Sequence, residues 1–268
     1  MTGKKPGAAK NGQPLPSGPA PDTPGTPDAS DPAAVSLWER LDRPAPAPRA
    51  TLTPQKIAAA AVRIADTDGI DAVTMRRLAT ELSVAPMAAY RYVSGKADVL
   101  DLMTDAVYAD LTLPDDVENW RDVMRANALR SREIVLRHPW LIQISSPQSL
   151  RALTPHRMAM AERGLASLDG LGLDVDAMMA VLGTVNSYVH GAVSAECAHY
   201  SLMREQGAAS NDDLRLALAP QMRYLIGTGR YPTYHRYLLE ATRKDDPQWR
   251  FETGLDSVLD GIAARLGI

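Results

Sequence analysis

The sequence predicts an all-α protein. From Thr51 onward, apolar residues recur at spacings of three and four, which places them on one side of successive helices. Sustained alternation of apolar and polar residues is nearly absent, and the chain contains one Phe and few clusters of β-branched residues. Helix-breaking residues divide the chain into segments of ordinary helix length. These breakers include Gly69, Ser94, Gly95, Pro114, Pro139, Pro147, Pro155, Gly170, Gly172, Gly207, Pro220, Gly227, Gly229 and Pro232.

Residues 1–50 differ in composition from the rest of the chain. They hold eleven of the twenty prolines, together with many Gly, Ala, Ser and Asp residues. Such a segment cannot bury enough apolar surface to offset the entropy lost on ordering, so we predict a disordered tail. Residues 35–41 are an exception, because Val35, Trp38 and Leu41 recur at spacing three and would share one side of a short helix.

Charge is unevenly distributed along the chain. Residues 51–96 carry six Lys or Arg and four Asp or Glu, a net charge of +2, whereas residues 97–268 carry seventeen and twenty-three, a net charge of −6. A sequence pI near 6.0 argues against a protein that coats nucleic acid without specificity. It leaves room for one small basic surface in residues 51–96.

Several features favour the cytoplasm. The chain has one cysteine, Cys197, which excludes an internal disulfide and a cysteine zinc cluster. No apolar run approaches the roughly 20 residues that a membrane span needs. Lys4, Lys5 and Lys10 are not followed by the apolar segment of a secretory signal. We expect a soluble cytoplasmic protein with no membrane partner.

The first helix of the regular part has clear boundaries. Thr53 is a good N-cap, and Pro54 occupies the first helical position, where its missing N–H costs nothing. Gly69 is the expected stop, because Gly readily adopts the left-handed backbone that ends a helix. The apolar stripe consists of Ile57, Ala60, Ala61 and Ile64.

A second helix is expected to begin after Thr74, another N-cap candidate. Its apolar residues follow at helical spacing and are Met75, Leu78, Ala79 and Leu82. Residues 83–85 are too few for anything except a tight turn, and Pro86 then opens a third helix. This turn favours φ > 0 at position 83, where Gly is commonly preferred and this chain has Ser83. The buried side of the third helix is marked by Ala89, Tyr92 and Val93.

Helix, turn and helix at this spacing indicate a helix-turn-helix, whose second helix presents its N-terminal residues to base edges in the major groove. Arg91 is the outward residue that can pair bidentately with guanine. Tyr90 can bond a phosphate through its hydroxyl, and Met87 and Ala88 offer apolar surface to a thymine methyl group.

Two further cations flank this surface. Arg76 projects from the second helix, and Lys96 begins the next helix, where its ammonium and free N–H groups can hold a phosphate. Any one of these side chains could simply be solvated. Their occurrence together at this spacing favours DNA binding.

Residues 52–103 resemble the N-terminal domain of the tetracycline-repressor (TetR) family. The fingerprint is Ala-Tyr-Arg-Tyr-Val at residues 89–93, followed by Lys96 and an apolar helix with Leu100. The resemblance implies a set of residues that contact DNA. To this set we add Thr74, at the start of the second helix. The predicted set is Thr74, Arg76, Pro86, Met87, Ala88, Tyr90, Arg91, Tyr92 and Lys96.

Most of residues 115–266 is similar, more loosely, to the tetracycline-repressor-like C-terminal domain. The similarity rests on residues 120–121 with 137–140, on the Gly172-Leu173 helix start leading to residues 191–192, and on residues 251–255 with 259–261. It implies a helical-bundle domain for effector binding and dimerisation. We therefore predict a tail at 1–50, a three-helix helix-turn-helix DNA-binding domain at 51–97 and a helical-bundle domain at 98–268.

The effector site is less defined by the sequence. Polar groups on the apolar helix at 176–203, and a His-Pro-Trp helix break, are candidates for lining a pocket. The alternatives are hydrogen-bonded buried groups or dimer contacts for the polar residues, a structural corner for the helix break, and core packing for the Met residues. The candidate pocket residues are His138, Trp140, Met158, Met178, Asn186 and His190.

No metal or cofactor is expected. His190 and His199 are nine residues apart, so they point in opposite directions on one helix and cannot share an ion there. Gly-rich phosphate loops, nucleophile elbows and His-Glu-x-x-His motifs are absent from the sequence, which argues against an enzyme.

The sequence thus predicts a homodimeric repressor of a near-palindromic operator in double-stranded DNA, released by an unidentified small-molecule effector. The alternative is a small-molecule sensor or adaptor whose helix-turn-helix does not bind DNA. The weak basic charge and the Ser83 turn motivate that alternative.

Overall fold

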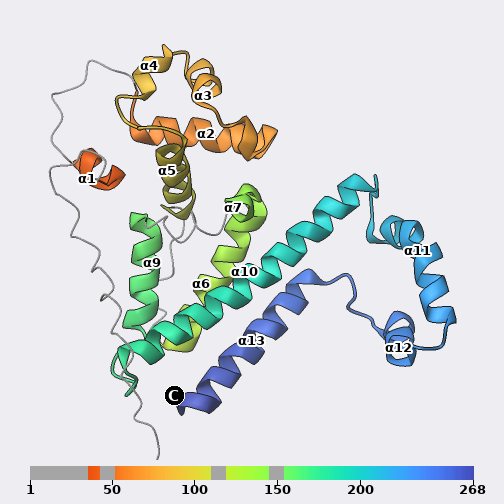
Figure 1. Ribbon diagram of the computed structural model, residues 1–268. Helices are drawn as coiled ribbons and strands as arrows, with labels where there is room; N and C mark the ends of the chain where they lie inside the picture. The colour runs from red at the N-terminus through yellow and green to blue at the C-terminus, as the bar shows by residue number, and fades with distance from the viewer. Residues whose placement is uncertain (1–35, 43–51, 110–118, 145–153) are drawn as a thin grey trace, which may run out of the picture. The chain divides into compact units, whose positions relative to one another are not determined.

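The structure is a computed structural model that describes residues 36–42, 52–109, 119–144 and 154–268 (Figure 1). All regular elements in these ranges are helices, which confirms the predicted fold class. The chain divides into two compact units, residues 1–44 and 45–268. None of the described helices is long and apolar enough to cross a membrane.

The first unit contributes one described helix, α1 (Leu37–Asp42). It confirms the short helix expected within residues 35–41, with Leu37 rather than Trp38 as its buried residue. Val35 and the other residues of the predicted disordered tail lie outside the described ranges.

The second unit begins with the helix-turn-helix region. It consists of α2 (Pro54–Asp68), the 3-10 turn η2 (Ile70–Ala72), α3 (Met75–Glu81) and α4 (Pro86–Ala89). The Thr53 hydroxyl caps α2 by accepting a hydrogen bond from the Lys56 N–H, and Gly69 ends the helix at φ 86°. The predicted stripe of α2 is buried, with Ile57 fully enclosed. The boundaries predicted for this helix are therefore confirmed.

The turn between α3 and α4 has the backbone that the sequence predicted. Ser83 has φ 53° and is the one non-glycine residue with positive φ among the described residues. The Val84 N–H donates to the Ala79 carbonyl at 3.0 Å, which closes the turn onto the end of α3. Ser83 therefore holds a left-handed conformation that costs an L-residue roughly 1–2 kcal/mol.

Helix α5 (Lys96–Ala109) packs along α2 and also contacts α9 (Pro155–Ala166). It runs without a break across the predicted boundary between residues 97 and 98. Its buried residues include Val99, Leu102 and Met103. The helix therefore links the DNA-binding region to the rest of the unit.

The rest of the unit, which we call the body, is built on three long helices. These are α6 (Trp120–Arg137), α10 (Val175–Glu205) and α13 (Pro247–Leu266), and each contacts the other two. Helix α10 agrees with the helix predicted at 176–203. The core between them includes Met124, Val185 and Leu255. Cys197 packs against this core, and burial raises the pKa of its thiol.

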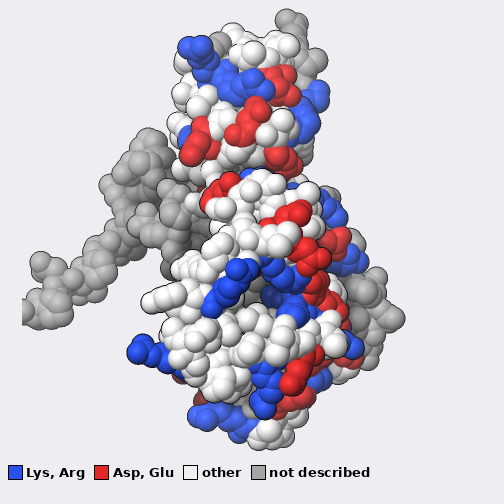
Figure 2. Space-filling model, turned by 90° about the vertical axis from the view of Figure 1, so that its right-hand side faces the viewer, with Lys and Arg blue, Asp and Glu red and all other residues white. Residues whose placement is uncertain are grey.

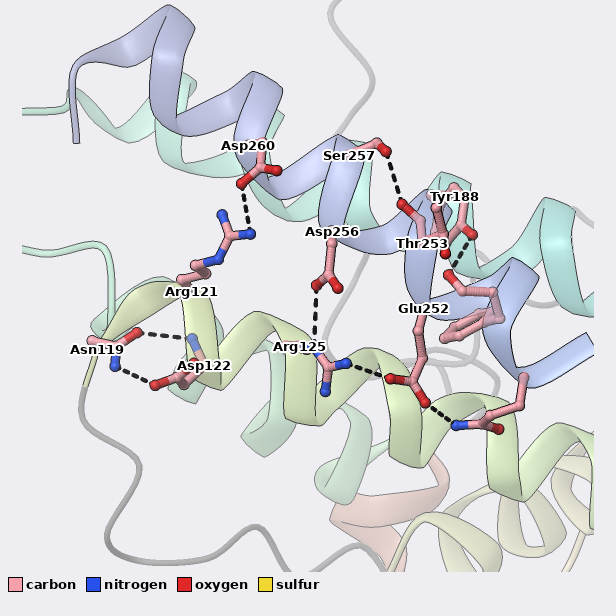
Figure 3. A network of polar contacts seen from close by, with 12 residues as sticks. Asn119, Arg121, Asp122, Arg125, Tyr188, Glu252, Thr253, Asp256, Ser257 and Asp260 are labelled. Atoms are coloured by element: carbon pink, nitrogen blue, oxygen red, sulfur yellow. Dashed lines mark hydrogen bonds and ion pairs between the residues drawn. The ribbon is translucent and has the colours of Figure 1, made fainter.

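Ion pairs fasten α6 to α13 along one side of the core (Figure 3). Arg125 donates to Glu252 at 2.5 Å and to Asp256 at 3.1 Å. One turn earlier on α6, Arg121 pairs with Asp260 at 2.7 Å. Hydrogen bonds from Gln248 and Arg125 lower the pKa of Glu252. Because these ion pairs are partly exposed, they add little to the stability of the protein. Their main effect is to fix the register of the two helices.

Helices α10 and α13 approach closely at one point. The Tyr188 hydroxyl on α10 donates to the Phe251 carbonyl on α13 at 2.7 Å (Figure 3). The ring of Tyr188 lies so near the Gly254 backbone that a Cβ at that position would overlap the phenol. Gly254 is therefore required by the packing of the two helices.

The chain between α10 and α13 forms α11 (Asn211–Gly227) and α12 (Pro232–Glu240). The sequence predicted a helix break at Pro220, and this was wrong because α11 continues through Pro220 to Gly227. A proline inside a helix removes one backbone hydrogen bond and crowds one preceding carbonyl, and the remaining bonds carry the helix past it. Residues 206–210 form the loop between α10 and α11.

Replacing Ser83 with Gly should leave the free energy of unfolding unchanged or raise it by up to about 1 kcal/mol, because Gly adopts positive φ without steric cost. Replacing Ser83 with the β-branched Val should lower it by about 1–2 kcal/mol. Equilibrium urea unfolding measures both changes. A Val variant as stable as the parent would contradict a left-handed residue at this turn.

Gly254→Ala should destabilise the protein by about 1–3 kcal/mol, because the added methyl group forces Tyr188 or α13 to move. Its exposed neighbour offers a control, since Thr253→Ala should change stability by less than about 0.5 kcal/mol. Thermal and urea unfolding of the three proteins test this. Equal stability of all three would show that α10 and α13 do not approach closely at Gly254.

Candidate DNA-binding surface and effector site

The start of α3 is held by Thr74, whose hydroxyl accepts a hydrogen bond from the Arg77 N–H at 3.1 Å. The Thr74 hydroxyl hydrogen stays available to a phosphate oxygen. Arg76 is exposed in the first turn of α3. Its neighbour Arg77 is turned to Asp68, with which it pairs at 3.2 Å. Arg76 therefore offers an exposed cation at the start of α3.

Helix α4 is shorter than the predicted third helix. It ends at Ala89, and the chain continues as a tighter turn in which the Tyr92 N–H donates to the Ala89 carbonyl at 3.0 Å. Ala89 and Val93 are almost fully buried. These two residues anchor the segment and leave the intervening side chains outside.

The outward side chains of this segment are the predicted base readers. Met87 is 72% exposed and Tyr90 is 45% exposed. Arg91 is also exposed, whereas Ala88 and Tyr92 are half-buried. Pro86 opens α4, as expected. The segment therefore presents one guanidinium, one phenol and one thioether on one short exposed surface.

Lys96 has a structural contact that the sequence did not reveal. Its ammonium donates to the Ile70 carbonyl at 3.3 Å and so ties the start of α5 to η2. An ammonium has three donors, so two remain for a phosphate oxygen. Lys96 is exposed and lies two residues after Ser94, whose N–H donates to Asp98 at 2.7 Å.

The six residues predicted to line an effector pocket do not come together in one site. Met158 is half-exposed on α9, and Met178 packs against the body core. Asn186 and His190 lie on the exposed side of α10. His138 and Trp140 lie at the break between α6 and α7 (Trp140–Gln143).

His138 and Trp140 both bind Asp66 of α2. The Trp140 indole N–H donates to the Asp66 carboxylate at 2.7 Å, and His138 Nδ1 lies 2.8 Å from the same oxygen. Trp140 is 2% exposed, so this contact is largely screened from water. The helix break thus forms a corner that joins the body to the first helix of the DNA-binding region. No sequence pattern predicts this pairing, because the partners are more than 70 residues apart.

A second contact joins α9 to α5. The His156 backbone N–H and His156 Nδ1 each lie 2.9 Å from an oxygen of Asp105. The Asp105 carboxylate therefore holds the start of α9. Together with Asp66, it fixes two helices of the body to the two helices that frame the DNA-binding surface.

Two cavities adjoin one another beside the C-terminal half of α10. One has a volume of about 460 Å³ and the other of about 650 Å³. Residues from α10, α11 and the start of α13 line them, and α12 contributes to the larger one. None of the six predicted pocket residues lines either cavity. The sequence showed His199 and Glu196 on a helix but could not show that other helices enclose them.

Comparison with known proteins agrees with this arrangement. The family model "Bacterial regulatory proteins, tetR family" matches residues 57–103, and "Tetracyclin repressor-like, C-terminal domain" matches residues 113–266. The HTH-type transcriptional repressor DrrR1 of Streptomyces coeruleorubidus is 33% identical over 84% of this chain and 83% of its own. An HTH-type transcriptional regulator of Saccharopolyspora erythraea is 32% identical over 89% and 96%.

Solved structures show the same fold. The TetR family protein ActR of Streptomyces coelicolor, crystallised with actinorhodin, superposes with a TM-score of 0.63 at 24% identity, covering 80% of this chain and 97% of its own. The family models together span both the helix-turn-helix and most of the body. This chain belongs to the tetracycline-repressor family and is a DNA-binding transcriptional regulator, not an enzyme.

Proposed function

We propose that this protein is a homodimeric repressor that binds a near-palindromic operator and is released by a small-molecule effector bound in the body. The observation that carries the proposal is the exposed surface of Met87, Tyr90 and Arg91, held in place by buried Ala89 and Val93. The rest of the predicted DNA-binding set flanks this surface. A relative named as a repressor supports the sign of the regulation.

Dimerisation follows from the small number of base readers. Each bidentate base contact contributes about 1–3 kcal/mol of discrimination, so one recognition surface distinguishes few sequences. Two copies related by a twofold axis would read two half-sites about 34–36 Å apart on one side of the DNA. A regulator of chromosomal DNA works in the bacterial cytoplasm, and we place this chain there.

The exposed side of α10 is the proposed surface for the second copy. It carries Asn186 and His190, with small residues such as Gly183 and Gly191 around them. Small residues let two helices approach closely, and a twofold interface needs a surface that fits itself. Asn186 and His190 would then be dimer contacts, one of the alternatives that the sequence left open.

Release would act through the distance between the two DNA-binding regions. The contacts of Asp66 and Asp105 tie α2 and α5 to the body, so a shift of the body helices moves the recognition surface. An effector can change operator affinity only by as much as it prefers one arrangement of the body over the other.

Arg91→Ala should weaken operator binding by about 1–3 kcal/mol and relax the preference at one base pair, because it removes the bidentate partner of a guanine. Lys96→Ala should weaken binding to all sequences and flatten the salt dependence by about one unit of slope. Fluorescence anisotropy with labelled promoter-proximal DNA, titrated with salt and competitor, measures both.

Arg130→Ala removes an equal charge from the exposed side of α6 and should change neither quantity. If Arg91→Ala and Lys96→Ala both bind like the parent, the assignment of DNA contacts is wrong. If the parent itself binds only weakly and without preference for any sequence, the sensor or adaptor alternative replaces the repressor.

The double variant Asn186→Asp and His190→Asp should shift the protein from dimer to monomer, because a twofold axis would bring like charges together. Operator affinity should fall in parallel. Sedimentation equilibrium measures the first effect and anisotropy the second. Met158→Asp places a similar charge on exposed α9 and should leave the dimer intact. A double variant that stays dimeric would exclude this side of α10 as the interface.

A further inference from the structure

The two cavities beside α10 share walls. Each has a volume typical of a small-molecule site, at about 460 and 650 Å³. Four residues line both of them: His199, Asn211, Lys244 and Asp245. The two cavities therefore adjoin one another at these residues. Figure 2, viewed from the side on which α11 and α12 lie in Figure 1, shows Lys and Arg side chains around a hollow.

The larger cavity has an apolar and aromatic wall. Leu218 and Met222 of α11 line it together with Tyr234 and Tyr237 of α12. The two tyrosine rings lie 5.7 Å apart between centroids, and both remain about half-exposed. Helix α12 has no buried residue, so its aromatic faces are not used by the protein core. Flat aromatic ligands stack on such faces.

The cavity walls carry more cations than carboxylates. The cations in the walls are Arg215, Arg223, Lys244 and Arg250, and the carboxylates are Glu196 and Asp245. Both carboxylates are already paired, Glu196 with Arg132 at 2.8 Å and Asp245 with Arg215. The hydrogen bond from Arg215 lowers the pKa of Asp245, so this carboxylate is ionised at neutral pH.

Arg223 is the cation with most freedom to bind a ligand. It is exposed and makes no hydrogen bond or ion pair with any residue in the described part of the chain. Its guanidinium can pair bidentately with a carboxylate or contact a phenolate. The aromatic wall and this cation lie in the same cavity.

We propose that these adjoining cavities bind a planar aromatic anion, a carboxylate or phenolate carried on a ring system, and that this ligand is the effector. The ring system stacks against Tyr234 and Tyr237, and the anionic group binds Arg223. The effector role rests on the proposed function, whereas the binding site does not.

A continuous set of contacts connects the cavity to the DNA-binding region. Glu196 lines the smaller cavity and holds Arg132 of α6. His138 caps the C-terminal end of α6 and binds Asp66 of α2. A ligand that displaces α10 relative to α6 therefore also acts on α6. The C-terminal end of α6 is tied to α2 and so helps to position the recognition surface.

The test uses two fluorescent probes of similar shape with the full chain. 1-Anilinonaphthalene-8-sulfonate is an aromatic anion, and N-phenyl-1-naphthylamine has the same ring system without the charge. The parent should bind the anion saturably with a stoichiometry near one per chain. Arg223→Gln should weaken the anion roughly tenfold and leave the neutral probe unchanged, because it removes one charge-assisted contact. Arg230→Gln, an exposed position that lines neither cavity, should bind both probes like the parent.

A second variant fills the site. Ala219→Trp places an indole in the larger cavity and should abolish binding of both probes, with circular dichroism confirming that the helices remain. Unchanged anion binding in Arg223→Gln, or unchanged binding of both probes in Ala219→Trp, would overturn the proposed site.

Operator binding separates the site from the effector role. Without probe, the parent and both variants should bind operator DNA equally. If the parent does not bind operator DNA, the proposed function alone is overturned. A saturating concentration of the anion should weaken operator binding by the parent and not by Ala219→Trp. Weakening of equal size in both proteins would overturn the effector role of this cavity.

Discussion

The ion pair between Arg132 and Glu196 holds together the three helices on which the body is built. Two parallel hydrogen bonds of 2.9 and 2.8 Å join the guanidinium of α6 to the carboxylate of α10. The same guanidinium lies 5.3 Å from the ring centre of Phe251 on α13. Both charged side chains are about nine-tenths buried, at 12% and 9% exposure. Loss of either partner alone would leave an unpaired buried charge, which typically costs about 3–5 kcal/mol.

The ion pair between Arg132 and Glu196 therefore has two roles. It sets the spacing of α6, α10 and α13, and Glu196 also forms part of a cavity wall. The more exposed pairs of Arg121 and Arg125 only add register between α6 and α13. A rigid core is needed because small displacements reach the recognition surface only if the helices between move as solid bodies.

Local sequence was sufficient for the DNA-binding region. Thr53, Pro54, Gly69 and Thr74 act through hydrogen bonds and backbone angles within a few residues, so the boundaries they predict agree with the structure. The positive φ of Ser83 was predictable for the same reason. The length of α4 was overestimated, because after Ala89 the Tyr92 N–H bonds the carbonyl three residues before it, and the residue pattern did not show this tightening.

The body was predictable only as a set of helices. From the sequence, Trp140 and His138 could either line a pocket or form a structural corner. Their contact with Asp66 decides for the corner, and no local sequence pattern predicts that this residue of another helix lies beside them. The cavities arise between α10 and segments up to 63 residues later in the chain, so their walls are visible only after packing. The helix break predicted at Pro220 was wrong because the loss of a single backbone hydrogen bond disrupts a helix of 17 residues only weakly.

The short segment after Pro86 separates what the fold needs from what the DNA meets. Ala89 and Val93 face inward and are small, whereas Met87, Tyr90 and Arg91 face outward and contribute little to the core. Evolution can therefore exchange the outward side chains, and with them the operator sequence, while the protein keeps its stability. Duplicated copies of such a gene can acquire new target promoters by a few substitutions and retain the same response to their ligand.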